Sequence, residues 1–600
     1  MNTGLPFDFY THRVQQLSAS LIELKRKKLR FAWLRFLSFL AVPVAAWALW
    51  SYSFWIVAPV IFGLLALFVF VIKKDLQNKE AIANTELLIQ INKDEQQYLQ
   101  HDFYSFADGK HLQPEHHAYA NDLDLFGRSS LYQYINRTSS QQGNQLFADW
   151  LLEPASPETV LQRQKAVKEL ANEKEWRQQL QAFGIASPLQ LKTEKNISQW
   201  LKEPNQFLHK TGWTIARFLL PLVSFVILGA FLGGYIPDSA FYSLLLLMLC
   251  INLLISKKIL KAWLQLGKIT EELDTLSNSL RWIEQKNFES ELLQQLKQKS
   301  SFNGQLKASQ SIQQLKKILD RFDYRLNPVV FIPLSVFLSW DLQQIIALEK
   351  WKEKNQQELK NWFEALAEFE SLSSLGNLRF NHPGWCMPEL VAGDAVFEGT
   401  EIGHPLLPPN KCVNNSFATN GAPAINLITG SNMAGKSTFL RSVGVNIVLA
   451  MMGAPACAES LRLSPLKVIS SMRISDNLEE STSTFYAELK KLKEVIDAVN
   501  RKEKVFLLLD EILRGTNSAD RHAGSKALIK QLVQHNGAGI VATHDLELAK
   551  LEQEHPGSIH NYHFDVQVTG EELYFDYKLK RGVCQSMNAS ILMKKIGIEL

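Results

Sequence analysis

Two long stretches of the chain are almost entirely apolar. Residues 36–72 contain no charged side chain, and residues 218–256 contain only one, Asp238. A helix that crosses a bilayer takes roughly 20 apolar residues, so each stretch is long enough for a tight pair of spans. Turns are expected near residues 51–53 and in the G-G-Y-I-P-D-S run at 233–239. The pattern therefore predicts two transmembrane helical hairpins, at about 36–72 and 218–256.

Basic residues flank both apolar stretches, whereas neither inter-span turn carries a lysine or arginine. The flanking charges lie in residues 25–35, 73–74, 210–217 and 257–261. Lysine and arginine accumulate on the cytoplasmic side, so both hairpins are expected to enter and leave from there. This predicts an integral protein of the inner (plasma) membrane with a cytoplasmic N-terminus. The alternative is two pairs of buried core helices in a soluble protein.

The segments between and after these stretches are polar and have few helix breakers. Residues 121–175 are expected to form a soluble helical segment. Helical periodicity also runs through residues 259–299, 312–322 and 342–372, which are rich in Gln, Lys, Glu and Leu. These helices are interpreted either as long arms that act as levers or as helices that merely pack on one another.

The last third of the chain carries short, continuous apolar runs at residues 425–428, 505–509 and 539–542. Such runs are typical of buried parallel strands. Directly after the first run, residues 430–437 read G-S-N-M-A-G-K-S, which fits the phosphate-loop pattern G-x-x-x-x-G-K-[ST]. Gly430 and Gly435 leave room for backbone N–H groups around a phosphate. Lys436 is expected to reach the β/γ-phosphates, and the Ser437 hydroxyl to bind Mg²⁺.

The other two apolar runs end in residues suited to hydrolysis. The run 505–509 ends in Asp510 and Glu511, and the run 539–542 is followed by Thr543 and His544. Ligands bind at the carboxyl ends of strands in open α/β sheets. There Asp510 is expected to hold the Mg²⁺ shell, Glu511 to act as general base, and His544 to sense the γ-phosphate. The sequence therefore predicts an ATP hydrolase with ATP and Mg²⁺ as cofactors.

These motifs resemble those of the MutS family of mismatch-recognition ATPases, which has an ABC-type nucleotide-binding architecture. Residues 428–438 (I-T-G-S-N-M-A-G-K-S-T) are similar to its T-G-P-N-M-G-G-K-S-T, and 483–488 (S-T-F-Y-A-E) to its S-T-F-x-x-E. Residues 509–518 (L-D-E-I-L-R-G-T-N-S) resemble D-E-I-G-R-G-T-S-T, and 542–544 its A-T-H. The resemblance is strong over residues 391–600.

The resemblance implies a homodimer with two composite ATP sites that join when ATP binds and separate after hydrolysis. It implies that Ser483 reaches across to the partner's nucleotide and that Ser437 and Asp510 are the metal ligands. The implied catalytic pair is Glu511 and His544. The implied cofactor-binding residues are Gly430, Asn432, Gly435, Lys436, Ser437, Thr438 and Ser483.

The chain also departs from the family. Mismatch-sensing members carry a Phe-x-Glu reader, and no Phe here is followed two positions later by Glu. The second hairpin lies where DNA-encircling members extend a clamp. The 64 basic and 60 acidic residues nearly balance, so no global polyanion-binding signature exists. Two hypotheses stay open: an ATPase that acts on DNA or a DNA structure near the membrane, and a nucleotide-gated membrane scaffold that recruits a partner without DNA.

Five regions are expected along the chain. The fold class is an α/β ABC-type P-loop ATPase domain at the C-terminus, preceded by a helical core and lever region and the two hairpins. The five cysteines are scattered and form no C-x-x-C pair, which fits a reducing cytosol. The regions are 1–78 with the first hairpin, 79–210 helical core, 211–260 second hairpin, 261–385 helical core and lever, and 386–600 ATPase domain.

Overall fold

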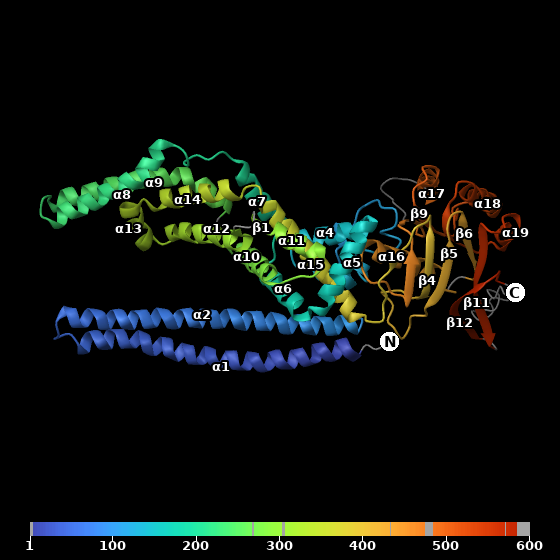
Figure 1. Ribbon diagram of the computed structural model, residues 1–600, viewed down its shortest axis with the longest axis horizontal. Helices are drawn as coiled ribbons and strands as arrows, with labels where there is room; N and C mark the ends of the chain where they lie inside the picture. The colour runs from blue at the N-terminus through green and yellow to red at the C-terminus, as the bar shows by residue number, and fades with distance from the viewer. Residues whose placement is uncertain are drawn as a thin grey trace.

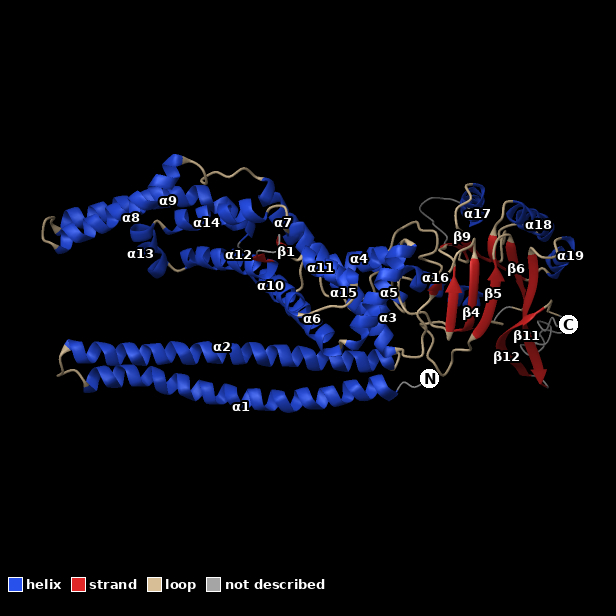
Figure 2. Cartoon of the chain, viewed as in Figure 1, coloured by secondary structure: helices blue, strands red, loops and turns tan. Residues whose placement is uncertain are grey.

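The computed structural model describes residues 4–266, 269–302, 306–431, 434–473, 484–569 and 572–584. The molecule is elongated, with two helical hairpins at one end, a β-sheet domain at the other, and a body of helices between them (Figure 1). Helices and strands are segregated along the long axis (Figure 2). A helical N-terminal region is thus followed by a C-terminal α/β region, as the sequence predicts.

The first hairpin is built from two very long helices, α1 (Gly4–Ala48) and α2 (Phe54–Leu99). The turn between them covers the predicted residues 51–53. Each helix keeps one proline, Pro43 or Pro59, within its apolar half. At 1.5 Å per residue α2 is about 70 Å long, so it continues well past residue 78, where the first region was expected to end. Its apolar and polar halves therefore form one continuous helix.

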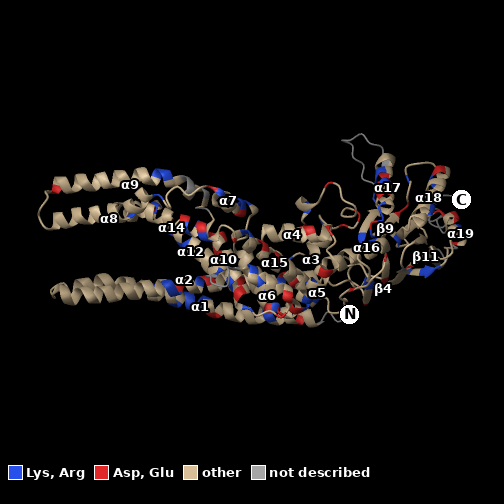
Figure 3. Cartoon of the chain, turned by 45° about the horizontal axis from the view of Figure 1, so that its top comes forward, with Lys and Arg blue, Asp and Glu red and all other residues tan. Residues whose placement is uncertain are grey.

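The second hairpin consists of α8 (Thr211–Leu232) and α9 (Asp238–Leu266). The helices α1, α2, α8 and α9 are long and apolar enough to cross a membrane. In the apolar 18-residue window of α1, and likewise in that of α2, only 6 % of the window is buried inside the protein. Both hairpins point to the same end of the molecule, and Figure 3 shows their outer portions free of Lys, Arg, Asp and Glu apart from the tip of the second hairpin. Asp238, the one acid, starts α9 beside the turn.

The helical body is assembled from segments on both sides of the second hairpin. The stretch 259–299 is divided among α9, α10 and α11. Ser290 accepts a hydrogen bond from the Leu293 amide and so caps the start of α11. The short α13 was not predicted from the sequence. The body comprises η1 (Lys110–Leu112), α3 (Leu131–Ile135), α4 (Gln141–Leu152), α5 (Pro157–Asn172), α6 (Lys174–Ala186), α7 (Leu191–Lys202), α10 (Thr270–Gln285), α11 (Glu291–Lys299), β1 (Ser301–Phe302), β2 (Leu306–Lys307), α12 (Ala308–Phe322), η2 (Asp323–Leu326), α13 (Pro328–Leu338), α14 (Trp340–Asn355) and α15 (Leu359–Asn381).

The C-terminal domain contains a six-stranded and a four-stranded sheet. The six strands lie in the order β12-β11-β6-β10-β9-β8, and all neighbours pair in parallel except β11 with β12. The four strands lie in the order β3-β7-β4-β5. The elements are β3 (Glu389–Leu390), β4 (Val396–Ile402), β5 (Asn415–Asn420), β6 (Ala424–Thr429), α16 (Lys436–Met452), β7 (Ser460–Leu463), β8 (Lys467–Ser471), α17 (Thr484–Asn500), β9 (Val505–Asp510), α18 (Ser518–Gln534), β10 (Ala538–Thr543), η3 (Leu546–Lys550), α19 (Leu551–Glu554), β11 (Ile559–Thr569) and β12 (Glu572–Arg581).

Both faces of the six-stranded sheet are covered, which explains its continuous apolar strands. Every residue of β6, β9 and β10 is buried. One face packs through Phe506 and Phe564 against α16 and the smaller sheet, where Phe397 lies 5.8 Å from Phe506 between ring centroids. The other face packs against α17 and α18. A parallel sheet buried on both sides selects such uninterrupted apolar runs.

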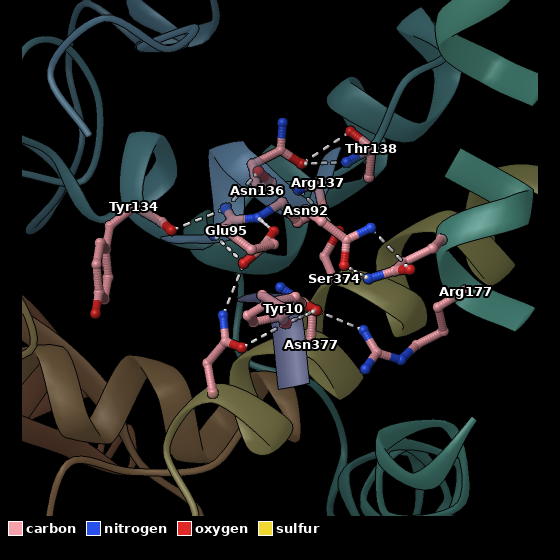
Figure 4. A network of polar contacts seen from close by, with 12 residues as sticks. Tyr10, Asn92, Glu95, Tyr134, Asn136, Arg137, Thr138, Arg177, Ser374 and Asn377 are labelled. Carbon is pink, nitrogen blue, oxygen red and sulfur yellow. Dashed lines mark hydrogen bonds and ion pairs between the residues drawn. The ribbon is translucent and has the colours of Figure 1, made fainter. Parts of the chain in front are cut away.

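A buried polar network fastens the base of the first hairpin to the helical body (Figure 4). The carboxylate of Glu95, a residue of α2, accepts a hydrogen bond from Arg137 Nε at 2.5 Å. It also accepts one at 2.7 Å from Nδ2 of Asn381, which belongs to α15. Tyr10 Oη, on α1, donates to Asn381 Oδ1 at 2.7 Å. The Arg137 guanidinium lies 3.3 Å from the centroid of the Tyr98 ring. Both hairpin helices are thus tied to α15, the helix that leads into the sheet domain.

Candidate nucleotide site

The described residues at both ends of the loop between β6 and α16 are suited to binding an anion. Gly430 follows the last residue of β6, and Gly435 immediately precedes the first residue of α16. Gly435 has φ 104°, and a Cβ there would approach the Tyr577 ring to 3.1 Å, so a side chain would be strained. The seventeen-residue α16 directs its free N–H groups toward the loop. These backbone donors and the helix dipole favour a bound anion.

Lys436 is held inside this loop. Its Nζ donates to the carbonyls of Gly430 at 2.8 Å and Ser431 at 2.9 Å. The same atom lies 3.3 Å from His544 Nε2. Burial lowers the pKa of Lys436 from its usual 10.5, partly offset by the charges of Asp510 and Glu511. A buried ammonium whose protein partners are carbonyls and acids is positioned to attract phosphate oxygens.

The next residue, Ser437, faces the end of β9. Its Oγ donates to Asp510 Oδ2 at 2.5 Å. Asp510 is 6 % exposed, and its other oxygen, Oδ1, makes no hydrogen bond within the part of the chain that the structure describes. A buried carboxylate oxygen without a donor is costly in a protein interior, and a hard divalent cation beside a serine hydroxyl would satisfy it.

Glu511 is held in a strained backbone conformation. Its φ is 48°, in the left-handed region that non-glycine residues rarely adopt. Its carboxylate lies 2.5 Å from His544 Nε2 and 3.0 Å from Arg514 Nε. The hydrogen bond from His544, opposed by burial and aided by the charge of Arg514, lowers the pKa of Glu511. Glu511 is therefore ionised at neutral pH, the form that a general base requires.

A second acid, Glu488 on α17, fixes the backbone that follows Glu511. The Leu513 and Arg514 amides both donate to Glu488 Oε1. Glu488 is 3 % exposed, so its removal would leave two amide donors without their partner. This contact positions the loop 511–514 relative to the strand end.

Three adjacent strands bring most of the predicted residues together. Lys436, Ser437 and Thr438 form the first turn of α16 after β6. Asp510 ends β9 and Glu511 follows it, and His544 follows β10, which lies between β6 and β9. Two predicted residues, Asn432 and Ser483, lie outside the described residues. Their expected roles stay predictions.

The prediction from sequence missed three residues of the site. Arg514 binds Glu511, Glu488 supports the following loop, and Tyr577 of β12 lies against Gly435. Arg514 and Glu488 stand inside motifs that were quoted for the family resemblance, which was a usable signal. Tyr577 lies in a stretch that is similar to the family's closing pattern, but nothing in the sequence placed it beside Gly435, because β12 reaches the loop through the sheet order and not through sequence proximity.

These features define a mixed-sheet α/β domain in which a phosphate-loop motif joins β6 to α16, and comparison with known proteins shows what this domain is similar to. Residues 426–596 match the family model for MutS domain V. The DNA mismatch repair protein MutS of Chlorobium phaeovibrioides is 33 % identical over 225 residues, 36 % of this chain and 25 % of that protein. The protein of the same name from Ruminiclostridium cellulolyticum is 33 % identical over 276 residues, which cover 43 % of this chain and 31 % of that protein. The human MutS protein homolog 4 is 30 % identical over 222 residues, which cover 35 % of this chain and 23 % of that protein.

The C-terminal region of the chain matches MutS domain V, and the resemblance to the MutS family inferred from sequence motifs is confirmed. The matched region spans only a quarter to a third of these curated relatives.

Proposed function

We propose that this protein is a membrane-anchored MutS-like ATPase that binds and hydrolyses ATP with Mg²⁺ in a head-to-head dimer. The observation that carries the proposal is the convergence of Lys436, Ser437, Asp510, Glu511 and His544 at the carboxyl ends of three neighbouring parallel strands. Ligands of open α/β sheets bind at this edge.

The residues present fit ATP and Mg²⁺. Asp510 Oδ1, which has no hydrogen-bond partner among the described residues, and the Ser437 hydroxyl offer oxygen ligands, which Mg²⁺ prefers. The loop 430–437 and the N-terminus of α16 offer backbone donors to phosphate. Mg²⁺-ATP supplies the phosphoanhydride bond that is cleaved. Lys436 would hold the phosphates, Thr438 and Asn432 would line the nucleotide, Glu511 would accept a proton from water, and His544 would orient Glu511 and contact the terminal phosphate.

The same proposal covers the assembly and its location. Two copies would each complete the other's site through Ser483, which gives the homodimer. The hairpins would cross the inner (plasma) membrane as four spans, leaving the ATPase domain and the N-terminus in the cytoplasm. Their outer portions, free of charged side chains apart from Asp238, lie at one pole of the molecule and the sheet domain lies at the other, which supports this arrangement. The regions 1–78, 79–210, 211–260, 261–385 and 386–600 would be its working parts.

Replacing Lys436 by alanine is expected to weaken ATP binding. The variant loses the one charged side chain in the sequence 430–437. Hydrogen bonds to charged groups contribute roughly 1.5–3 kcal/mol, or about 10- to 100-fold in Kd. Equilibrium binding of a fluorescent ATP analogue to purified protein in nanodiscs measures it. Lys411→Ala, an exposed lysine in the loop before β5, is the matched control and should bind as the parent does. Equal affinity of Lys436→Ala and the parent would refute the assigned role.

DNA is the proposed partner of the dimer because its relatives are named DNA mismatch repair proteins. One observation favours the alternative of a nucleotide-gated scaffold without DNA. In the basic stretch 307–325, Lys316 is paired with Asp274 at 2.8 Å and Arg325 with Asp341 at 2.9 Å, so these charges are not free for phosphates.

Duplex and branched DNA titrated against the ATP-loaded protein distinguish the two functions. With six to ten phosphate contacts, affinity should fall roughly 10³- to 10⁵-fold between 50 and 200 mM salt. Absence of binding at low salt, together with turnover that responds to lipid or a protein partner only, would replace the DNA function by the scaffold.

A further inference from the structure

Helix α13 is short, apolar and packed against the second hairpin. Its sequence PVVFIPLSVFL carries no charged side chain, and it contacts α8 and α9. At 1.5 Å per residue its eleven residues extend about 16 Å, roughly half of a 30 Å hydrocarbon core, so it cannot cross a bilayer. It is bent by 79° from α14. Figure 1 shows it lying beside the α8–α9 hairpin.

The outward face of α13 exposes large apolar side chains. Val329 is 82 % exposed and Ile332 is 46 % exposed, next to Leu326 at 68 %. The exposed face continues the apolar surface of α9, where Leu246 is 61 % exposed. A continuous exposed apolar surface of this kind marks a site that contacts another protein or a membrane.

Several polar groups at the inner end of α13 are bound by protein, whereas the buried Ser335 Oγ and Ser339 Oγ make no hydrogen bond among the described residues. Ser224 Oγ of α8 donates to the Val336 carbonyl at 2.6 Å, and both residues are buried. The helix ends at Ser339 in a left-handed turn (φ 46°), and next to it Asp341 accepts from Ser256 Oγ at 2.5 Å and Arg325 Nη2 at 2.9 Å. Helix ends at membrane depth need such internal partners, because hydrocarbon offers none.

Between α9 and α13 lies an apolar groove of about 310 Å³. Its α9 wall lies within Asp238–Leu260, the part of α9 that is apolar enough to span a membrane. No residue of the first hairpin lines it. In a bilayer, apolar surface that protein does not cover is covered by lipid chains. The walls include Leu245, Leu246, Leu249, Ile332, Val336 and Phe337.

We propose that α13 is inserted in the membrane beside the second hairpin and that the groove between α9 and α13 holds a phospholipid acyl chain. The inference rests on the proposed membrane anchoring of α8 and α9. It adds a half-membrane helix to the four spans and a lipid-binding site to the ATPase. A lipid chain at this place contacts the helix that continues into α14, α15 and the sheet domain.

The first experiment tests the insertion of α13 with a charged, membrane-impermeant maleimide on full-length Val329→Cys protein in vesicles, read by peptide mapping. Native Cys250, exposed on α9 within the span, reports on the hairpin itself, and Lys354→Cys on the exposed face of α14 is the aqueous control. Val329→Cys and Cys250 should both react at least about tenfold more slowly than Lys354→Cys, because hydrocarbon excludes a charged reagent.

The outcomes separate the two proposals. If Cys250 is shielded and Val329→Cys reacts as fast as Lys354→Cys, insertion of α13 is overturned while the anchoring of the hairpin stands. If Cys250 also reacts at the aqueous rate, the membrane anchoring itself fails.

The second experiment identifies the occupant of the groove. Vesicles of phosphatidylethanolamine and phosphatidylglycerol with a trace of diazirine-bearing acyl chain are irradiated, and adducts are mapped. Adducts are expected at Val336 and Phe337 and should drop several-fold in Leu246→Trp, whose ring fills the groove. Leu254→Trp, also exposed on α9 but outside the groove lining, should leave them unchanged. Absence of lipid adducts at these residues, or an equal adduct yield in Leu246→Trp and the parent, would overturn the lipid assignment.

Discussion

Replacing Glu511 by glutamine is expected to abolish most ATP turnover while ATP still binds. Glutamine keeps the shape and the contact with His544, but it cannot accept a proton from water. General-base catalysis contributes roughly 10²–10⁴-fold, so kcat should fall by that factor with little change in affinity. Phosphate release from full-length protein in nanodiscs measures the turnover, and equilibrium binding measures the affinity.

A matched control for this variant lies at the opposite end of the same strand. Glu503 precedes β9, pairs with Arg501 at 2.8 Å and is far from the phosphate loop in the sheet. Glu503→Gln should hydrolyse ATP at the parental rate. Turnover of Glu511→Gln equal to that of Glu503→Gln would remove Glu511 as the base and leave the ATPase mechanism to another residue.

The second large effect is expected at the base of the first hairpin, where Arg137→Ala should destabilise the protein by about 3–5 kcal/mol. The side chain of Glu95 is only 3 % exposed, and alanine would leave its charge buried without its cation. Denaturant unfolding in detergent, followed by intrinsic fluorescence, measures the loss. The exposed pair of Lys25 and Glu86 joins the same two helices at 2.8 Å, and Lys25→Ala should cost less than about 1 kcal/mol.

The ion pair of Glu95 and Arg137 also makes the stability of the protein depend on pH. Burial alone would raise the pKa of Glu95, but the charge and hydrogen bond of Arg137 outweigh it, and the pKa is lowered from 4.5. The contribution of the pair is therefore full above pH 4.5 and is lost as the pH falls through the lowered value. Glu95→Gln combined with Arg137→Met should be more stable than Arg137→Ala alone, since no buried charge is left unpaired. An equal loss in the double variant would contradict this account.

The sequence by itself determined the elements whose signal is local. The three buried strands at 424–429, 505–510 and 538–543 follow from uninterrupted apolar runs, and the start of α16 follows from the phosphate-loop pattern. The hairpin turns follow from breaks in the long charge-free stretches. Each of these depends on the chemistry of neighbouring residues, which periodicity and composition report directly.

Contacts between distant segments were decided only by the tertiary structure. Two prolines in eleven residues, Pro328 and Pro333, concealed α13, although Pro328 occupies the first helical turn, where its missing N–H costs nothing. The contact of Tyr577 with Gly435 depends on strand order, and the pairing of Glu95 with Arg137 and Asn381 joins segments far apart in the chain. A polar side chain is buried only where folding brings it a partner, and no periodicity along the sequence records which partner that is.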